Sequence, residues 1–349
     1  MSASSIRFWQ AAALVFAGAV AAVSTAPATA AEEVNLYSVR QPALIQPLLD
    51  AFARESGIKV NVVFAESGMI ERLKAEGANS PADAVLTTDV GTLHDMVEAD
   101  LLRGVKSETL ERNIPKAYRH PDGLWFGLTT RARVAYVSKD RVKPGEVVNY
   151  SDLADPRFKG KICLRSGKHV YNVSLIASMI AHDGEPATKR WLEGVKANLA
   201  AKPQGSDRSQ AKSIMEGSCD ISLANTYYLG LMNADPAQKP WGDAVKAVFP
   251  NSQGRGTHVN ISGGAVTQSS KNPANAVKLL EFLSKDEAQK RYAEDNFEYP
   301  VKAGVPVHPF IASLGQFKAD PIDLAEVAKL RARATRLVDE VGFDQGGGA

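Results

Sequence analysis

The chain has 349 residues, of which 44% are hydrophobic and 23% are charged, a composition that is ordinary for a globular protein and excludes a disordered one. Length alone predicts about two domains, at roughly 150 residues each. Lysine and arginine number 41 against 39 aspartate and glutamate, which gives a net charge of +2. The chain therefore lacks the large basic field that would favour nucleic acid as a partner. Two cysteines are too few for a disulfide-rich scaffold or a cysteine-only zinc site.

The first thirty residues have the pattern of a secretory signal peptide. Arg7 is the only charged residue before Glu32, and residues 11–23 are rich in alanine and valine. Ala28 and Ala30 then form the small-x-small pattern that precedes cleavage, so we expect cleavage near Ala30. A transmembrane anchor is the alternative, but the apolar stretch is shorter than the ~20 residues that span a bilayer. The sequence therefore predicts an exported protein of the periplasm.

Export bears on the two cysteines, which both lie in short strand-like runs. Cys163 follows Gly160-Lys161-Ile162, and Cys219 opens the run 219–223. An oxidising compartment preserves disulfides, so we expect a Cys163–Cys219 bridge, with two buried free thiols as the alternative. The bridge would close a loop of about 56 residues and stabilise the fold.

In chain order after the leader, strands alternate with helices. Strands are predicted at 34–38, 59–64 and 84–87, and helices at 43–56, 69–76 and 90–99. This β-α-β-α-β order is typical of a parallel sheet with helices on its faces. A second set follows: strand 161–165, helices 172–183, 186–198 and 207–217, strand 219–224 and helix 227–233.

Two long strand-like runs, 128–137 and 256–266, lie between and after these sets. We therefore predict an α/β clamshell of two lobes joined by two hinge strands. The N-terminal lobe would comprise 31–132 and 262–349, including a packing helix at 323–341, and the C-terminal lobe 133–261.

Three of the nine tyrosines are placed to converge. Tyr227 and Tyr228 follow strand 219–224, and Tyr171 follows strand 161–165. Ligands of open α/β sheets bind outside the carboxyl ends of the strands. Tyr171 and Tyr227 each lie eight residues after a cysteine, so a disulfide between neighbouring strands would bring the three phenols to one wall of the cleft.

Clustered phenols suit one kind of ligand. A phenol ionises near pH ~10, so a phenolate at neutral pH requires a strong Lewis acid. Ferric iron is hard and triply charged, and three phenolates would neutralise it. A zinc or copper site would more often show histidine and cysteine at short spacing. The alternative is that the tyrosine pair is only a packing platform.

At this point the sequence resembles the bacterial periplasmic ferric-iron-binding proteins, the substrate-binding subunits of iron ABC importers. The resemblance covers essentially the whole chain after the leader. Its motifs are NLYS (35–38), WFGL (125–128), RAR (131–133), VYN (170–172), NTYY (225–228) and EYPV (298–301).

The resemblance implies the periplasmic binding protein fold and no enzymatic activity. It implies Tyr171, Tyr227 and Tyr228 as ligands of Fe³⁺, and Arg131 as the anchor of carbonate or a similar synergistic anion. A planar guanidinium matches carbonate oxygens in pairs. It further implies a monomer that delivers iron to an inner-membrane ABC permease with its ATPase.

One motif departs from the family pattern. Several relatives continue the first strand as Leu-Tyr-Ser-x-Arg-His-Tyr, whose last two residues bind iron. Here Gln41 and Pro42 occupy those positions, and proline offers no side-chain ligand. We therefore expect three protein ligands, all from the second lobe, with an anion or water completing the coordination.

Other polar side chains lie near the predicted strand ends or in the hinge strands, and structural or solvated roles are the simpler interpretation for them. Arg133 shares a strand face with Arg131 and would bind either the anion or an interior carboxylate. The remaining candidates are Tyr37, Glu66, Ser67, Asp89, His169 and His258.

Two other functions stay open. One is a binding protein of the same architecture for an organic or oxyanion solute, such as a phosphonate, a polyamine or thiamine. The other is a secreted hydrolase, although no Gly-x-Ser-x-Gly, P-loop or His-Glu-x-x-His motif occurs and no catalytic residue is assigned.

Overall fold

The computed structural model describes residues 32–65 and 67–346. The predicted signal peptide, its cleavage site near Ala30 and the candidate residue Glu66 lie outside these ranges. No helix within them is long and apolar enough to cross a membrane.

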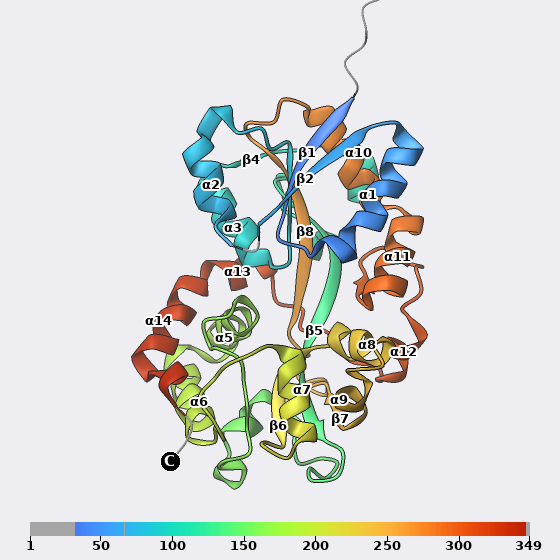
Figure 1. Cartoon of the computed structure of the whole chain (residues 1–349). Helices are drawn as coiled ribbons and strands as arrows, with labels where there is room; N and C mark the ends of the chain where they lie inside the picture. The colour runs from blue at the N-terminus through green and yellow to red at the C-terminus, as the bar shows by residue number, and fades with distance from the viewer. Residues whose placement is uncertain (1–31, 66, 347–349) are drawn as a thin grey trace, which may run out of the picture. The chain divides into compact units, whose positions relative to one another are not determined.

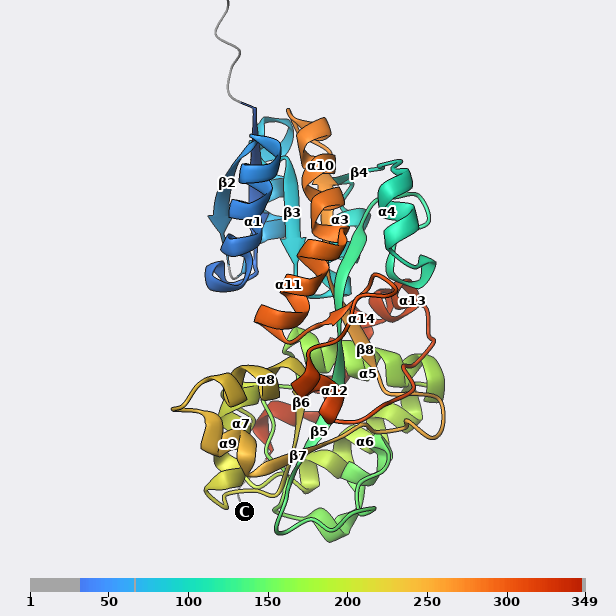
Figure 2. The same ribbon diagram turned by 90° about the vertical axis from the view of Figure 1, so that its right-hand side faces the viewer.

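The first lobe is built on a parallel sheet in which β1 (Glu33–Ser38) lies between β2 (Lys59–Phe64) and β3 (Ala84–Thr87). Side chains alternate across the sheet. Leu36 packs with the helices α1 (Pro42–Ser56) and α10 (Pro273–Ser284), which lie side by side in Figure 2.

The next residue of β1, Tyr37, points to the opposite face of the same sheet. There it packs with α2 (Met69–Glu76) and α3 (Val90–Glu98), which flank the sheet in Figure 1. The predicted parallel sheet with helices on both faces is confirmed.

Two long buried strands link the halves of the structure, as predicted. The first part of β5 (Phe126–Ser138) pairs with β8 (Val259–Thr267), and its second part pairs with β6 (Ile221–Asn225) and β7 (Val245–Val248). Every residue of β5 and β8 is buried. The strand order is β2-β1-β3-β8-β5-β6, so both lobes share β5.

The second lobe packs helices around the end of β5. Its core contains apolar side chains of α5 (Val170–Asp183) and α6 (Glu185–Ala197) together with Ile221 and Leu223 of β6. The predicted Cys163–Cys219 disulfide is present, with the two Cα atoms 5.8 Å apart.

One predicted strand is not formed. Residues 161–165 make only two isolated bridges, in which Ile162 pairs in parallel with Leu199 and with Ile221. The backbone N–H of Cys163 donates to the carbonyl of Ile221, but beyond it the side chains of Arg165 and Ser166 bind Asp207 and Asp344. Pairing is therefore confined to Ile162, and the segment does not continue as a strand.

The predicted C-terminal helix 323–341 is two helices, α13 (Leu324–Lys329) and α14 (Arg331–Val341), which are separated at Leu330. Leu337 and Val338 of α14 belong to the same apolar core as α5 and α6, and the three helices are neighbours in Figure 1. The lobe boundaries stay a prediction, which places α14 with the N-terminal lobe.

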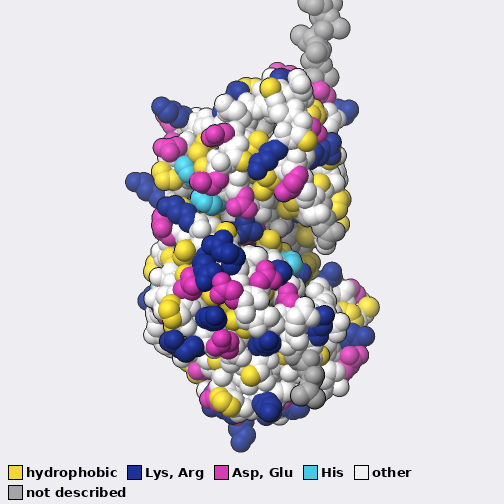
Figure 3. All heavy atoms as spheres, turned by 90° about the vertical axis from the view of Figure 1, so that its left-hand side faces the viewer, with side chains coloured by type: hydrophobic (Ala, Val, Ile, Leu, Met, Phe, Trp, Pro, Cys, Tyr) yellow, Lys and Arg dark blue, Asp and Glu magenta, His cyan; other side chains and the backbone are white. Residues whose placement is uncertain are grey.

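The other elements are shorter or more peripheral. They are β4 (Leu102–Arg103), α4 (Glu108–Asn113), α7 (Asp207–Met215), α8 (Tyr227–Ala234), α9 (Lys239–Asp243), α11 (Asp286–Asn296), β9 (Tyr299–Pro300) and α12 (Pro309–Ser313), with 3₁₀ turns at Gly77–Asn79, Lys116–Tyr118, Tyr150–Ala154, Pro156–Phe158 and Phe343–Gln345. On the face seen in Figure 3, basic and acidic side chains are interspersed, which agrees with the small net charge.

Candidate functional site

Three phenols gather at the N-termini of two helices. Tyr171 lies in the first turn of α5, and Tyr227 and Tyr228 open α8. The hydroxyl oxygens of Tyr171 and Tyr227 are 3.1 Å apart. The rings of Tyr227 and Tyr228 are stacked at an angle, with their centroids 4.2 Å apart. The structure therefore brings together the three tyrosines that the sequence analysis selected.

Backbone contacts at the end of β6 hold the Tyr227–Tyr228 pair in place. The hydroxyl of Tyr136 donates to the carbonyl of Asn225 at 2.9 Å, and the N–H of Thr226 donates to the carbonyl of Ala132. Both contacts come from the buried strand β5, so the turn into α8 is fixed against the strand that links the lobes.

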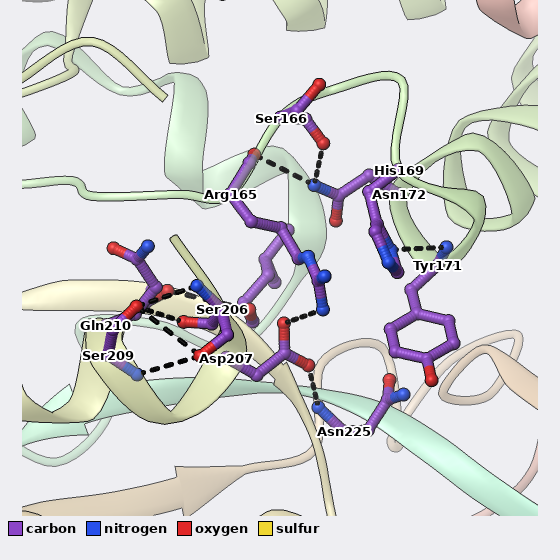
Figure 4. Close-up of polar contacts among 12 residues, drawn as sticks. Arg165, Ser166, His169, Tyr171, Asn172, Ser206, Asp207, Ser209, Gln210 and Asn225 are labelled. Carbon is purple, nitrogen blue, oxygen red and sulfur yellow. Dashed lines mark hydrogen bonds and ion pairs between the residues drawn. The ribbon is translucent and has the colours of Figure 1, made fainter. Parts of the chain in front are cut away.

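Tyr171 is positioned by the cap of its own helix. Nδ1 of His169 accepts a hydrogen bond from the backbone N–H of Tyr171 (Figure 4). The two rings meet edge to face with their centroids 4.5 Å apart. Burial, together with the nearby guanidinium of Arg165, lowers the pKa of His169 to about 3. His169 is therefore a neutral capping residue.

The phenols of Tyr227 and Tyr228 are poor acids in this environment. Burial raises the pKa of Tyr227 well above its ordinary value, and the neighbouring phenols raise it further. Burial also raises the pKa of Tyr228. Both phenols keep their protons at neutral pH unless a strongly charged cation displaces them.

Arg131 lies beside the tyrosines within a buried ion cluster. Its Nη2 is 2.8 Å from Oε1 of Glu298, and Nη1 of Arg40 is 2.9 Å from Oε2 of the same carboxylate. Both guanidiniums also donate to the hydroxyl of Ser262. Burial alone would raise the pKa of Glu298, but Arg40 and Arg131 hold it below its ordinary value. Two cations share one carboxylate, which leaves an excess positive charge.

This charge lies close to a phenol. The guanidinium carbon of Arg131 is 5.8 Å from the ring centroid of Tyr227. Arg131 is only 2% exposed, and its Nε is buried without a hydrogen-bond acceptor among the described residues.

A small cavity of about 10 Å³ adjoins Tyr171, which is room for about one water-sized group. Its other lining residues are Arg131, Arg133, Asn225, His258 and Asn260. Four of these residues carry a buried side-chain nitrogen without a partner in the described part of the chain: Nε of Arg131, Nε of Arg133, Nδ2 of Asn225 and Nδ1 of His258. The cavity therefore suits an acceptor such as a water or an anion oxygen.

The other candidates have structural partners. The hydroxyl of Tyr37 donates to Glu76, and Oδ2 of Asp89 caps α3 by accepting from the N–H of Thr92. Nε2 of His258 is 3.0 Å from the hydroxyl of Ser174. Arg133 pairs with the buried carboxylate of Asp207 at 2.6 Å, which is one of the two roles expected for it.

Gln41 and Pro42 are both exposed where α1 begins, with Pro42 as its first helical residue. Ser67 is exposed too. Within residues 32–65 and 67–346, no group of three or more His, Cys, Asp or Glu side chains is arranged to hold a metal.

Sequence reasoning missed several residues of the site. The missed residues are buried and form ion pairs near the tyrosines; they are Arg40, Glu298 and Asp207. Glu298 stands in one of the quoted motifs, but nothing in the local pattern indicates that its carboxylate is buried between two arginines.

The bacterial extracellular solute-binding protein family matches residues 48–319. "Iron uptake protein A1" of Synechocystis sp. is 45% identical over 315 residues, which cover 89% of this chain and 88% of that protein.

Solved structures are similar over nearly their whole length. The apo ferric ion-binding protein A of Pasteurella haemolytica is 53% identical with a TM-score of 0.87, covering 90% of this chain and 99% of that chain. The FutA protein of Trichodesmium, in complex with iron and citrate, is 44% identical with a TM-score of 0.85, covering 89% and 99%.

Proposed function

The chain belongs to the bacterial extracellular solute-binding protein family, and from this premise we propose that it captures ferric iron in the periplasm for import. The proposal is one of binding and not of catalysis. The predicted leader peptide and the ferric-iron-binding relatives support it.

The observation that carries the proposal is the convergence of three phenols. The oxygens of Tyr171 and Tyr227 are 3.1 Å apart, which is close enough for one ion to contact both. Because burial raises the pKa values of Tyr227 and Tyr228, only a strong Lewis acid would displace their protons. Fe³⁺ has this character, and three phenolates would balance its charge.

We further propose that Arg131 holds a synergistic anion. The buried Arg40–Glu298–Arg131 cluster carries an excess positive charge, and Nε of Arg131 is free among the described residues to donate to an oxygen. Carbonate would use this donor, and the citrate of the Trichodesmium complex makes a chelating carboxylate the second candidate.

The first lobe would contribute little to the coordination of the metal. Gln41 and Pro42 stand where several relatives carry a ligand pair, and both are exposed. We propose that the anion or water fills these positions, that the lobes close about β5 and β8, and that the closed monomer docks on an inner-membrane ABC permease with its ATPase.

A visible absorption titration of the mature protein with ferric citrate, with and without bicarbonate, tests the proposal. We expect a ferric–phenolate charge-transfer band that is lost in the double variant Tyr227→Phe/Tyr228→Phe. Tyr118→Phe is the matched control, because Tyr118 is a partly buried tyrosine that packs with the core of the first lobe.

Two other outcomes of this titration would contradict the proposal. A protein that stays colourless with ferric citrate, and whose melting temperature rises with a phosphonate, a polyamine or thiamine, would replace iron by an organic or oxyanion solute. A band that persists in the double variant would move the metal away from these tyrosines.

A further inference from the structure

The carboxylate of Asp207 contacts Arg165 and Asn225 near Tyr171 (Figure 4). Asp207 is fully buried. Its Oδ2 accepts from Nη1 of Arg133 at 2.6 Å and from the backbone N–H of Asn225 at 3.0 Å, and its Oδ1 accepts from Nη1 of Arg165 at 3.1 Å. Both carboxylate oxygens are therefore engaged.

The two guanidiniums that Asp207 binds lie against Tyr171. The guanidinium carbon of Arg165 is 5.3 Å from the ring centroid of Tyr171, and that of Arg133 is 5.8 Å away. Nη2 of Arg133 also donates to Oδ1 of Asn172, the residue after Tyr171. The ring that supplies the phenol is thus held in contact with two cations.

Asp207 also reaches the other tyrosines, through the main chain. Asn225 is the last residue of β6, two positions before Tyr227, and its N–H is the group that Asp207 accepts from. One side chain therefore connects two tyrosine-bearing segments that are 56 residues apart in sequence.

The local sequence fixes where Asp207 points. Ser206 caps α7 through a reciprocal pair of hydrogen bonds with Ser209, so Asp207 is the first residue of that helix. A negative charge is favoured at a helix N-terminus. Figure 4 shows the carboxylate directed from this turn toward Arg165 and Asn225.

We propose that Asp207 is the positioning residue of the metal site: it holds Arg133 and Arg165 beside Tyr171 and sets this phenol opposite Tyr227. This inference rests on the proposed function. Two guanidiniums share one carboxylate, so an excess positive charge remains beside the ring of Tyr171. Partners of this kind orient the ligand and tune its basicity.

The test is Asp207→Asn, which keeps the size of the side chain but replaces one acceptor oxygen with a donor. The two arginines bind different oxygens of Asp207, and asparagine keeps only one of these oxygens, so one guanidinium loses its acceptor and is released from Tyr171. We expect ferric affinity, measured by competition with citrate, to fall about 10–100-fold. We also expect the ferric–phenolate absorption maximum to shift.

Asp83→Asn is the matched control for a merely structural effect. Asp83 is equally buried, in the first lobe, and accepts hydrogen bonds from Asn35, Ser270 and Asn272, and from no arginine among the described residues. The Asp83→Asn variant should have a lower melting temperature than wild type and an unchanged ferric–phenolate absorption maximum.

Arg165→Gln keeps the inference testable if Asp207→Asn does not fold, because Arg165 is 12% exposed and tolerates replacement more easily. It should weaken iron binding and shift the band in the same direction as Asp207→Asn. Unchanged affinity and an unchanged band in the folded variants, with a normal wild-type band, would overturn the inference alone. A wild-type protein without the band would instead overturn the proposed function.

Discussion

The hydroxyls of Tyr171 and Tyr227 lie 3.1 Å apart across 56 residues of sequence, the same separation as that of the disulfide-bonded Cys163 and Cys219. Each tyrosine follows its cysteine by eight residues. The disulfide joins the two segments just before the phenols meet, and the backbone of Cys163 pairs with Ile221 at this point. The covalent bond therefore helps to set the register of the tyrosines.

The double variant Cys163→Ala/Cys219→Ala should lose stability and iron affinity together. Opening a 56-residue loop should reduce the free energy of unfolding by about 4 kcal/mol in the chain-entropy treatment. Urea denaturation of the metal-free protein measures this loss. Wild-type protein treated with reductant should show the same shift of the midpoint, and an unchanged midpoint in both would contradict the prediction.

Tyr171→Phe should separate stability from binding. The variant loses one hydroxyl of a half-buried side chain, so the melting temperature of the metal-free protein should stay within a few degrees of wild type. Iron affinity should fall by more than about 100-fold, or roughly 3 kcal/mol, because a direct ligand is removed. Citrate competition measures this change, and equal affinity in the variant and wild type would exclude Tyr171 as a ligand.

Iron binding should weaken as the pH falls. Burial raises the pKa values of Tyr227 and Tyr228, so at neutral pH both phenols are protonated and the metal must displace the protons. Each displaced proton makes the binding constant fall about tenfold per pH unit of acidification. The measurement is ferric affinity between pH 8 and pH 6, corrected for protonation of the citrate competitor.

Tyr227→Phe provides the internal check on that pH dependence. With one phenol fewer, the slope of log affinity against pH should decrease by about one. A slope that is the same in wild type and Tyr227→Phe would mean that this phenol keeps its proton when iron binds.

The strands and helices of the first lobe could be predicted because the hydrophobic pattern of each one lies within its own segment. Strands 59–64 and 84–87 and helix 69–76 have the predicted bounds, since period-two and period-3.6 alternation is legible within each segment. Residues 161–165 have the same strand-like composition but form bridges only at Ile162, because side chains from distant segments bind the residues that follow.

The tyrosine cluster was predictable for a different reason, the equal spacing of two tyrosines from two cysteines. The ion clusters that adjoin the tyrosines could not be predicted from the sequence in this way. Arg133 and Asp207 are 74 residues apart, and Arg131 and Glu298 are 167 apart. A buried charge whose partner is so distant in sequence does not produce a recognisable pattern in its own segment. For this reason the sequence analysis assigned no role to Asp207 or Glu298.

Glu298→Gln should destabilise the metal-free protein by about 3–5 kcal/mol, because it leaves the buried guanidiniums of Arg40 and Arg131 without their shared carboxylate. Glu55→Gln is the control, since Glu55 forms an exposed pair with Lys285 and should change stability by less than about 1 kcal/mol. Denaturant unfolding at pH 7 measures both.

The pH dependence of this difference identifies its cause. Arg40 and Arg131 outweigh the effect of burial and hold the pKa of Glu298 below its ordinary value. The stabilisation is therefore fully present above the unfolded pKa of about 4.3 and is lost as the pH falls through the lower folded value. The gap between wild type and Glu298→Gln should be constant from pH 6 to 8 and shrink below about pH 4. A gap that persists unchanged in acid would show that the variant acts through packing and not through the lost charge.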